Sequence, residues 1–133
     1  MGSEFTFYDY VDDGGRNVVH DWLHGSDLPM GVKVKFTNWL QHLEGTPPGE
    51  WKRPLVDTLD GHCAGLFEVR VSHSHRQYRI LGSHMGVDRT PTLMHCFIKP
   101  DDRVSEEDCD QALLRKAQVE GDPNKHRVEH DYG

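Results

Sequence analysis

The sequence predicts one α+β domain, with helices packed on one face of an antiparallel sheet and the other face left partly open. Apolar residues recur at helical spacing in the first third of the chain, alternate with polar residues between residues 66 and 98, and return to helical spacing after residue 105. The first connection between the alternating segments is too short for a parallel crossover. Because 133 residues is a usual size for one domain, a second domain with an independent core is not expected.

A short strand and two helices are expected in the N-terminal half. Residues 6–11 combine β-branched and aromatic side chains and precede a turn rich in glycine. Asn17 is expected to cap a helix that ends near Gly25. A second helix begins near Pro29, carries apolar residues at helical spacing, and is stopped by Gly45. The Thr-Pro-Pro-Gly stretch that follows predicts a loop.

Three antiparallel strands and a final helix are expected in the C-terminal half. The strands are residues 66–71, 77–81 and 92–98. Ser105 and the acidic residues after it form a capping box for a helix that reaches about Ala117. The chain is therefore divided into residues 1–5, interpreted as vector-derived, the domain at 6–120, and a loose polar tail at 121–133.

The formal charge of −7 argues against a generally basic nucleic-acid binder. The charge is unevenly distributed, however. Residues 65–99 carry five basic and two acidic residues, whereas residues 1–64 and 100–133 each carry ten acidic and five basic ones. A positive segment therefore lies between two acidic segments.

Membrane, disulfide and metal sites are not expected. No apolar run approaches the roughly 20 residues of a membrane-spanning helix, and no secretory signal is recognised, so the cytoplasm is the predicted location. Cys63, Cys96 and Cys109 follow no CxxC spacing and are expected to be buried, unpaired thiols. The ten histidines match no zinc motif, so no metal or other cofactor is predicted.

Charged side chains of the three predicted strands are expected to share one face of the sheet. Alternate residues of a strand lie on the same face of a sheet. This rule puts Glu68 and Arg70 on one face of the first strand, Arg79 on the unpacked face of the second, and His95 and Lys99 on one face of the third. One interpretation is a set of ion pairs on a solvated face. The other is a site that acts on RNA.

Cleavage of RNA without a metal needs residues of these types. A base removes the 2′-OH proton, the oxygen attacks phosphorus, and an acid protonates the departing 5′-oxygen. In this hypothesis Arg70 and Arg79 bind the phosphate, while His95 or Lys99 transfers protons, since histidine side chains titrate near neutrality. The residues predicted to bind substrate are Glu68, Arg76, Tyr78 and Arg89.

Three motifs in this region resemble the HigB-like branch of the RelE/ParE toxin superfamily, whose members are often described as phage-derived or "killer" proteins. The match is close over residues 54–118, whereas residues 6–53 agree mainly in the order of elements. The motifs are Gly65-Leu66-Phe67-Glu68-Val69-Arg70, then Tyr78-Arg79-Ile80-Leu81, then Leu93-Met94-His95-Cys96-Phe97-Ile98-Lys99 before a helix that contains Ala112.

The resemblance implies a RelE-like fold and the toxin component of a type II toxin–antitoxin system. Such a toxin would cleave mRNA at the ribosome and would be inhibited by an antitoxin, often one with a helix-turn-helix domain. Arg70, Arg79 and Lys99 match the basic residues of that family. The oligomeric state is left open, and a homodimer is compatible with the sequence.

The chain also departs from the family. Pro100 stands where a second lysine is usual, the chain is acidic where such toxins are usually basic, and no tyrosine follows the last strand before Tyr132. These departures favour a second hypothesis, a toxin fold that acts by binding, either like the gyrase-targeting ParE branch or only as an antitoxin partner. A third hypothesis, a small-ligand or metal-binding domain, rests on the histidine count alone.

Overall fold

The structure, a computed structural model, describes residues 5–52, 55–86, 89–99 and 104–132. Among these residues, six strands form one sheet in the order β2-β3-β4-β5-β1-β6. The strands are β1 Tyr8–Tyr10, β2 Val56–Thr58, β3 Phe67–His73, β4 Arg76–His84, β5 Pro91–Lys99 and β6 Arg127–Glu129. The helices are α1 Val18–Leu23, α2 Met30–Glu44, α3 Glu106–Gly121 and α4 Pro123–His126, with 3-10 turns η1 Pro48–Glu50 and η2 Gly61–Cys63. The predicted α+β class is confirmed.

The sheet is larger than the predicted three antiparallel strands, and it is mixed. β1 pairs with β5 in parallel, while the other neighbouring strands pair antiparallel. β2 and β6 span three residues each, too few to show an alternating pattern in the sequence. The strand pairing of β1 depends on the whole chain, so its place between β5 and β6 could not be read from its own residues.

The central hairpin forms as predicted. β3 and β4 are joined by Ser74 and His75, whose φ angles of 49° and 67° are both positive, as in a type I′ turn. The ladder between β4 and β5 has an irregularity at Leu81/Gly82. A side chain at Gly82 would clash there, because its Cβ would lie 2.6 Å from the Phe67 ring.

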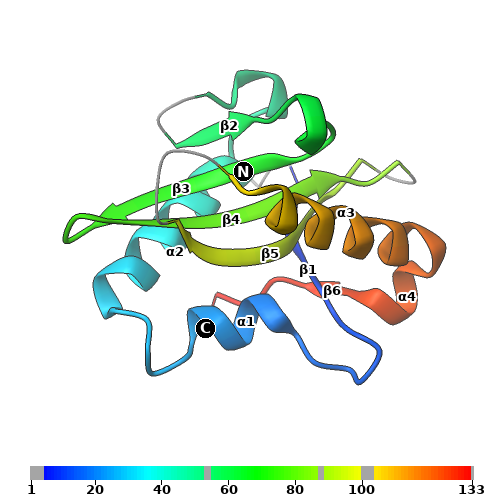
Figure 1. The fold of residues 1–133 in the computed structure, drawn as a ribbon, viewed down its shortest axis with the longest axis horizontal. Helices are drawn as coiled ribbons and strands as arrows, with labels where there is room; N and C mark the ends of the chain where they lie inside the picture. Colours follow the sequence, from blue (N-terminus) through cyan, green and yellow to red (C-terminus); the bar gives the residue numbers. More distant parts are fainter. Residues whose placement is uncertain (1–4, 53–54, 87–88, 100–103, 133) are drawn as a thin grey trace.

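Helices cover both faces of the sheet, so the prediction of helices on one face is wrong. α1 and α2 share a core with one face, which includes Val69 and Ile80. α3 shares a second core with the other face, which includes Leu81 and Met94. Figure 1 shows α3 in front of the strands and α2 behind them. The reason is that α3 presents its own apolar stripe, which must also be buried.

The predicted helix caps are confirmed. Asn17 precedes α1, and its side chain accepts a hydrogen bond of 2.9 Å from the His20 amide. Ser105 precedes α3, and its hydroxyl accepts a bond of 3.1 Å from the Asp108 amide. α2 ends before Gly45, as the sequence indicates.

Described residues near both ends of the chain belong to the fold. The segment predicted as a loose tail instead forms α4 and β6, and β6 pairs with β1. Immediately after β6 in the chain, His130 Nδ1 lies 2.8 Å from Oδ1 of the fully buried Asp9. Phe5, assigned to a vector remnant, packs against Trp51 at 5.3 Å between ring centroids, whereas residues 1–4 of that segment lie outside the described residues.

Candidate functional site

The predicted charged residues of the three central strands share the sheet face that α3 partly covers. Residues directly opposite in an antiparallel ladder lie on the same face. Arg70 on β3 is opposite Arg79 on β4. Glu68 on β3 is opposite Leu81 on β4, which is in turn opposite His95 on β5. Gln77, on the same face of β4 as Arg79 and Leu81, is opposite Lys99 on β5. The ladder irregularity falls before His95, so His95 and Lys99 remain on one face.

Glu68 is the centre of an ion-pair cluster on this face. Its Oε2 atom lies 3.4 Å from Arg79 Nε and 3.7 Å from Lys99 Nζ, and its Oε1 atom lies 3.9 Å from Arg70 Nε. Arg70 also lies 4.0 Å from Asp57 on β2. The side chains of Glu68, Arg79 and Lys99 are buried, whereas that of Arg70 is 31% exposed. We refer to these five residues as the Glu68 cluster.

Arg79 is held by further contacts inside the protein. Its guanidinium donates hydrogen bonds to the Tyr78 carbonyl at 3.0 Å and to Gln77 Oε1 at 2.9 Å. Buried charges are tolerated where they are paired in this way. Of the three basic residues in the Glu68 cluster, Arg70 is therefore the one best placed to meet a ligand from solvent.

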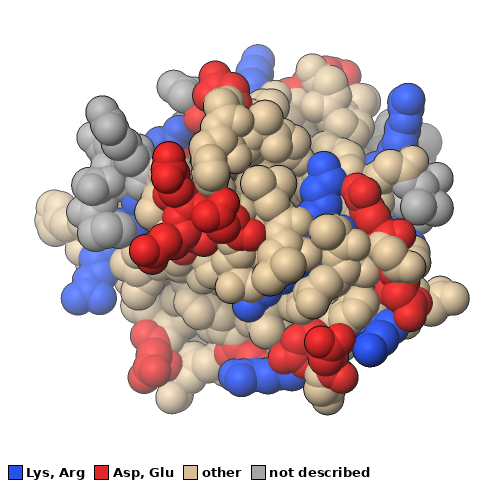
Figure 2. Space-filling view, turned by 45° about the vertical axis from the view of Figure 1, so that its right-hand side comes forward, with Lys and Arg blue, Asp and Glu red and all other residues tan. Residues whose placement is uncertain are grey.

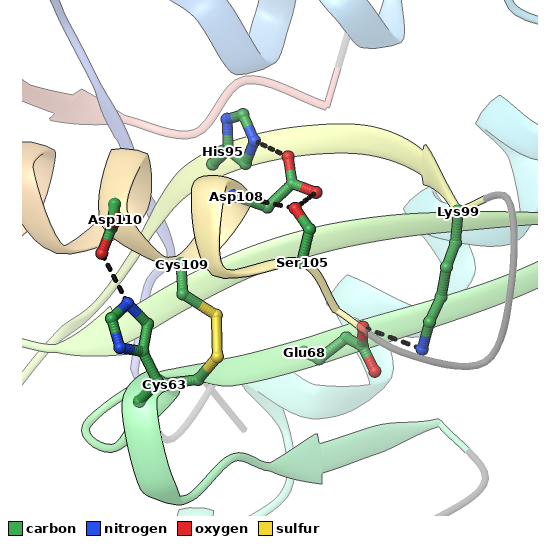
Figure 3. Close-up of a disulfide and its surroundings, with 9 residues drawn as sticks. Cys63, Glu68, His95, Lys99, Ser105, Asp108, Cys109 and Asp110 are labelled. Atoms are coloured by element: carbon green, nitrogen blue, oxygen red, sulfur yellow. Dashed lines mark hydrogen bonds and ion pairs between the residues drawn. A yellow bond between two sulfur atoms is a disulfide. The ribbon is translucent and has the colours of Figure 1, made fainter.

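His95 forms a second cluster, which connects β5 to α3. Its Nε2 atom lies 2.7 Å from Asp108 Oδ1, and Asp108 Oδ2 accepts a 2.7 Å hydrogen bond from Ser105 (Figure 3). Arg115 donates to His95 Nδ1 at 3.3 Å and to the Met94 carbonyl at 2.9 Å. Because Arg115 donates to Nδ1, the ring hydrogen of a neutral imidazole belongs on Nε2, facing Asp108. We refer to these four side chains as the His95 cluster.

The remaining predicted substrate-binding residues lie apart from both clusters. Tyr78 is buried in the core on the opposite face, with its ring 6.4 Å from that of Trp22. Arg76 is exposed at the first position of β4, and Arg89 lies in the β4–β5 connection at the other end of that strand. The structure therefore places Glu68 and the four predicted catalytic residues on one sheet face, with His95 in a cluster of its own, and it separates these three residues from them.

The chain matches the family described as phage derived protein Gp49-like (DUF891) over residues 21–117. The matched range is well over half of the chain. The chain belongs to this family. No match was found among curated proteins or among solved structures. The Gp49-like range runs from within α1 into α3 and includes both clusters, but it leaves out β1, α4 and β6.

A disulfide lies beside the His95 cluster in this Gp49-like protein, which corrects the prediction of three unpaired thiols. Cys63 of η2 and Cys109 of α3 are bonded, with Cα atoms 5.3 Å apart, while Cys96 is free. Figure 3 shows the bond next to Asp108 and Asp110, and Asp110 pairs with His62 at 2.6 Å. The bond attaches the first turn of α3 to η2. The pairing could not be predicted, because the two cysteines have a sequence separation of 46 and match no known disulfide motif.

Ser105, Asp108 and Arg115 were not predicted as site residues, although all three belong to the His95 cluster. The capping box indicated Ser105 and the acidic residues after it only as the start of a helix, and no motif pointed to Arg115. The contact of Asp108 and Arg115 with His95 depends on how α3 lies across the sheet. The signal that could have revealed Asp108 and Arg115 is their spacing of about two helical turns, which places both next to Ala112 on the side of α3 that packs on the sheet.

One face of the molecule carries both signs of charge. In the view of Figure 2, acidic and basic side chains are interspersed with uncharged surface. Within residues 5–52, 55–86, 89–99 and 104–132, no group of three or more His, Cys, Asp or Glu side chains is arranged to hold a metal ion. Over the same ranges, no helix is both long and apolar enough to cross a membrane.

Proposed function

We propose that this Gp49-like protein is the toxin of a type II toxin–antitoxin pair in the cytoplasm and cleaves mRNA at the ribosome without a metal. The observation that carries the proposal is the convergence of Glu68, Arg70, Arg79, His95 and Lys99 on one sheet face. The family match and the motifs that resemble HigB-like toxins support it. An antitoxin with a helix-turn-helix domain is the proposed partner.

The proposed reaction uses groups of both clusters. Arg70, the exposed cation, contacts the phosphate, while Arg79 and Lys99 keep positive charge beneath it. His95 removes the 2′-OH proton, the oxygen bonds to phosphorus to form a cyclic phosphate as the bond to the 5′-oxygen breaks, and the protonated His95 or the Lys99 ammonium supplies a proton to that oxygen. His95 would exchange its 3.3 Å contact with Arg115 for the substrate and keep the shorter contact with Asp108, which orients the ring.

A second candidate function is action by binding a protein. The observation that favours it is the burial of Arg79 and Lys99 against Glu68, which keeps two of the predicted catalytic groups from solvent. Both ring nitrogens of His95 also have partners inside the protein. In this case the chain acts on a target as ParE-like toxins do, or is only the partner of an antitoxin.

Induced expression in a bacterial host separates the two functions. The nuclease proposal predicts growth arrest with new mRNA ends from the wild type, and loss of both for Arg70→Ala and for His95→Gln. Arg16→Ala is the matched control, because Arg16 forms an exposed pair with Asp21 outside the site. Arrest without new mRNA ends would favour binding of another target. Absence of arrest from folded protein would contradict the toxin proposal in that host.

A further inference from the structure

A pocket lies at the end of the sheet where β3 begins and β4 ends, between the η1–β2 segment and α3. Its volume of about 320 Å³ falls at the lower end of the range for small-molecule sites, roughly 300–1,000 Å³. Its walls include Trp51, Phe67, His84 and Lys116. The two clusters described above contribute none of the residues that line it.

Three aromatic rings form one side of the pocket. The Trp51 centroid lies 5.2 Å from that of Phe67 and 5.1 Å from that of His84, and Phe67 and His84 are 5.2 Å apart. The indole N–H of Trp51 donates to the Thr46 carbonyl at 2.9 Å, which fixes the ring. The rings are inclined to one another by 40° to 84°, so a planar ligand would stack on one ring and meet the edges of the others.

Two polar groups complete the pocket. His84 Nε2 is buried and has no hydrogen-bond partner within the part of the chain that the structure describes. Burial, with a smaller contribution from the Lys116 charge, lowers the pKa of His84, which favours the neutral ring with one donor and one acceptor nitrogen. The Lys116 ammonium lies over Gly65, where an added Cβ would be 3.2 Å from Nζ. Because Gly65 has no side chain, the Lys116 ammonium can occupy this space.

We propose that this pocket binds a nucleotide, with the base against Trp51 and His84 and the phosphate on Lys116. An apolar ligand would leave the His84 nitrogen and the Lys116 charge without partners, which costs binding energy. A bare anion would use Lys116 but not the aromatic wall. A nucleotide satisfies both, since its base has a π-face and hydrogen-bonding edges and its phosphate pairs with an ammonium. The pocket does not depend on the proposed nuclease activity.

The test is a titration of the full chain with adenosine 5′-monophosphate, adenosine or inorganic phosphate, followed by NMR of the Trp51 indole and His84 ring signals. We expect adenosine 5′-monophosphate to shift both signals and to bind more tightly than either fragment. Lys116→Ala should weaken its binding about tenfold or more, because a charge-assisted bond is lost, and leave adenosine binding unchanged. Lys125→Ala, at an exposed lysine on α4, is the matched control and should have no effect.

Short single-stranded RNA is titrated in parallel to identify the source of the nucleotide. Tighter binding of a tetranucleotide than of the mononucleotide, with the same loss in Lys116→Ala, would assign the pocket to an RNA strand. The reverse order would assign it to a free nucleotide. The proposal is overturned if neither ligand shifts the Trp51 and His84 signals, if phosphate alone binds as tightly as the mononucleotide, or if Lys116→Ala has no effect.

Discussion

The Glu68 cluster and the His95 cluster lie on the same sheet face but hold their charges differently. In the Glu68 cluster, a buried carboxylate lies 3.4 and 3.7 Å from two buried cations. In the His95 cluster, the His95 and Asp108 side chains are 17% and 26% exposed and are joined at 2.7 Å. The difference indicates that the buried members of the first cluster, Glu68, Arg79 and Lys99, are part of the core and need all their charges. The second cluster attaches a strand to a helix near solvent and can change partners.

Glu68→Gln should produce the largest loss of stability. The substitution keeps the shape of the side chain but removes the negative charge with which Arg79 and Lys99 pair. Removing one partner of a buried ion pair costs about 3–5 kcal/mol of unfolding free energy. Urea denaturation measures the change, with Glu129→Gln, an exposed position on β6, as the control. A loss below about 1 kcal/mol would mean that the charges of the Glu68 cluster are not coupled as described.

Removal of the disulfide should have the next largest effect and should act on the His95 cluster first. Cys63→Ala/Cys109→Ala opens a loop with a sequence separation of 46, and loss of such a cross-link costs about 2–4 kcal/mol. Because Cys109 adjoins Asp108, NMR signals of His95 should shift more than those of Arg70. Cys96→Ala is the control. Detection of three free thiols in the native, unreduced protein would contradict the disulfide itself.

A double-mutant cycle on His95→Ala and Asp108→Ala should give a moderate coupling energy. A single, partly exposed hydrogen bond contributes about 1 kcal/mol, and the cycle removes the separate effect of Asp108 on the Ser105 cap. Chemical denaturation of the two single variants and the double variant gives the value. A coupling near zero would mean that the contact does not attach β5 to α3.

Arg70→Ala should have the smallest effect on stability and a large effect on activity. Arg70 is partly exposed and its ion pairs are 3.9 and 4.0 Å long, so its loss should change the unfolding free energy by no more than about 1 kcal/mol. The same variant should lose growth arrest. A large loss of stability would place Arg70 with the structural members of the Glu68 cluster.

Local patterns in the sequence predicted most of the strands and helices that carry the Glu68 cluster and the His95 cluster. Alternation identified β3, β4 and β5 and the shared face of their charged residues, and Asn17 and Ser105 marked the starts of two helices. Local patterns did not predict β6, because its three residues form a strand only by pairing with β1 and are too few to show an alternating pattern. For the same reason the contact of α3 with the sheet, and therefore Asp108 beside His95, could not be predicted.

The candidate site was predictable in its residue types but not in its burial. The sequence placed Arg79 and Lys99 on the unpacked face, where Arg79 was expected to bind the phosphate and Lys99 to transfer protons. In the structure Glu68 and the surrounding side chains bury both of them. Burial depends on how neighbouring segments cover the face, which an alternating pattern does not encode.

The chemical nature of the RNA ends tests the central claim most directly. RNA is isolated after induction of the wild type and of Arg70→Ala, and the new ends are mapped and characterised. Attack by a 2′-OH predicts 2′,3′-cyclic phosphate on the upstream fragment and a 5′-hydroxyl on the downstream fragment, both absent from Arg70→Ala. New ends that carry a 5′-phosphate, or no new ends during growth arrest by folded wild-type protein, would contradict the proposed reaction.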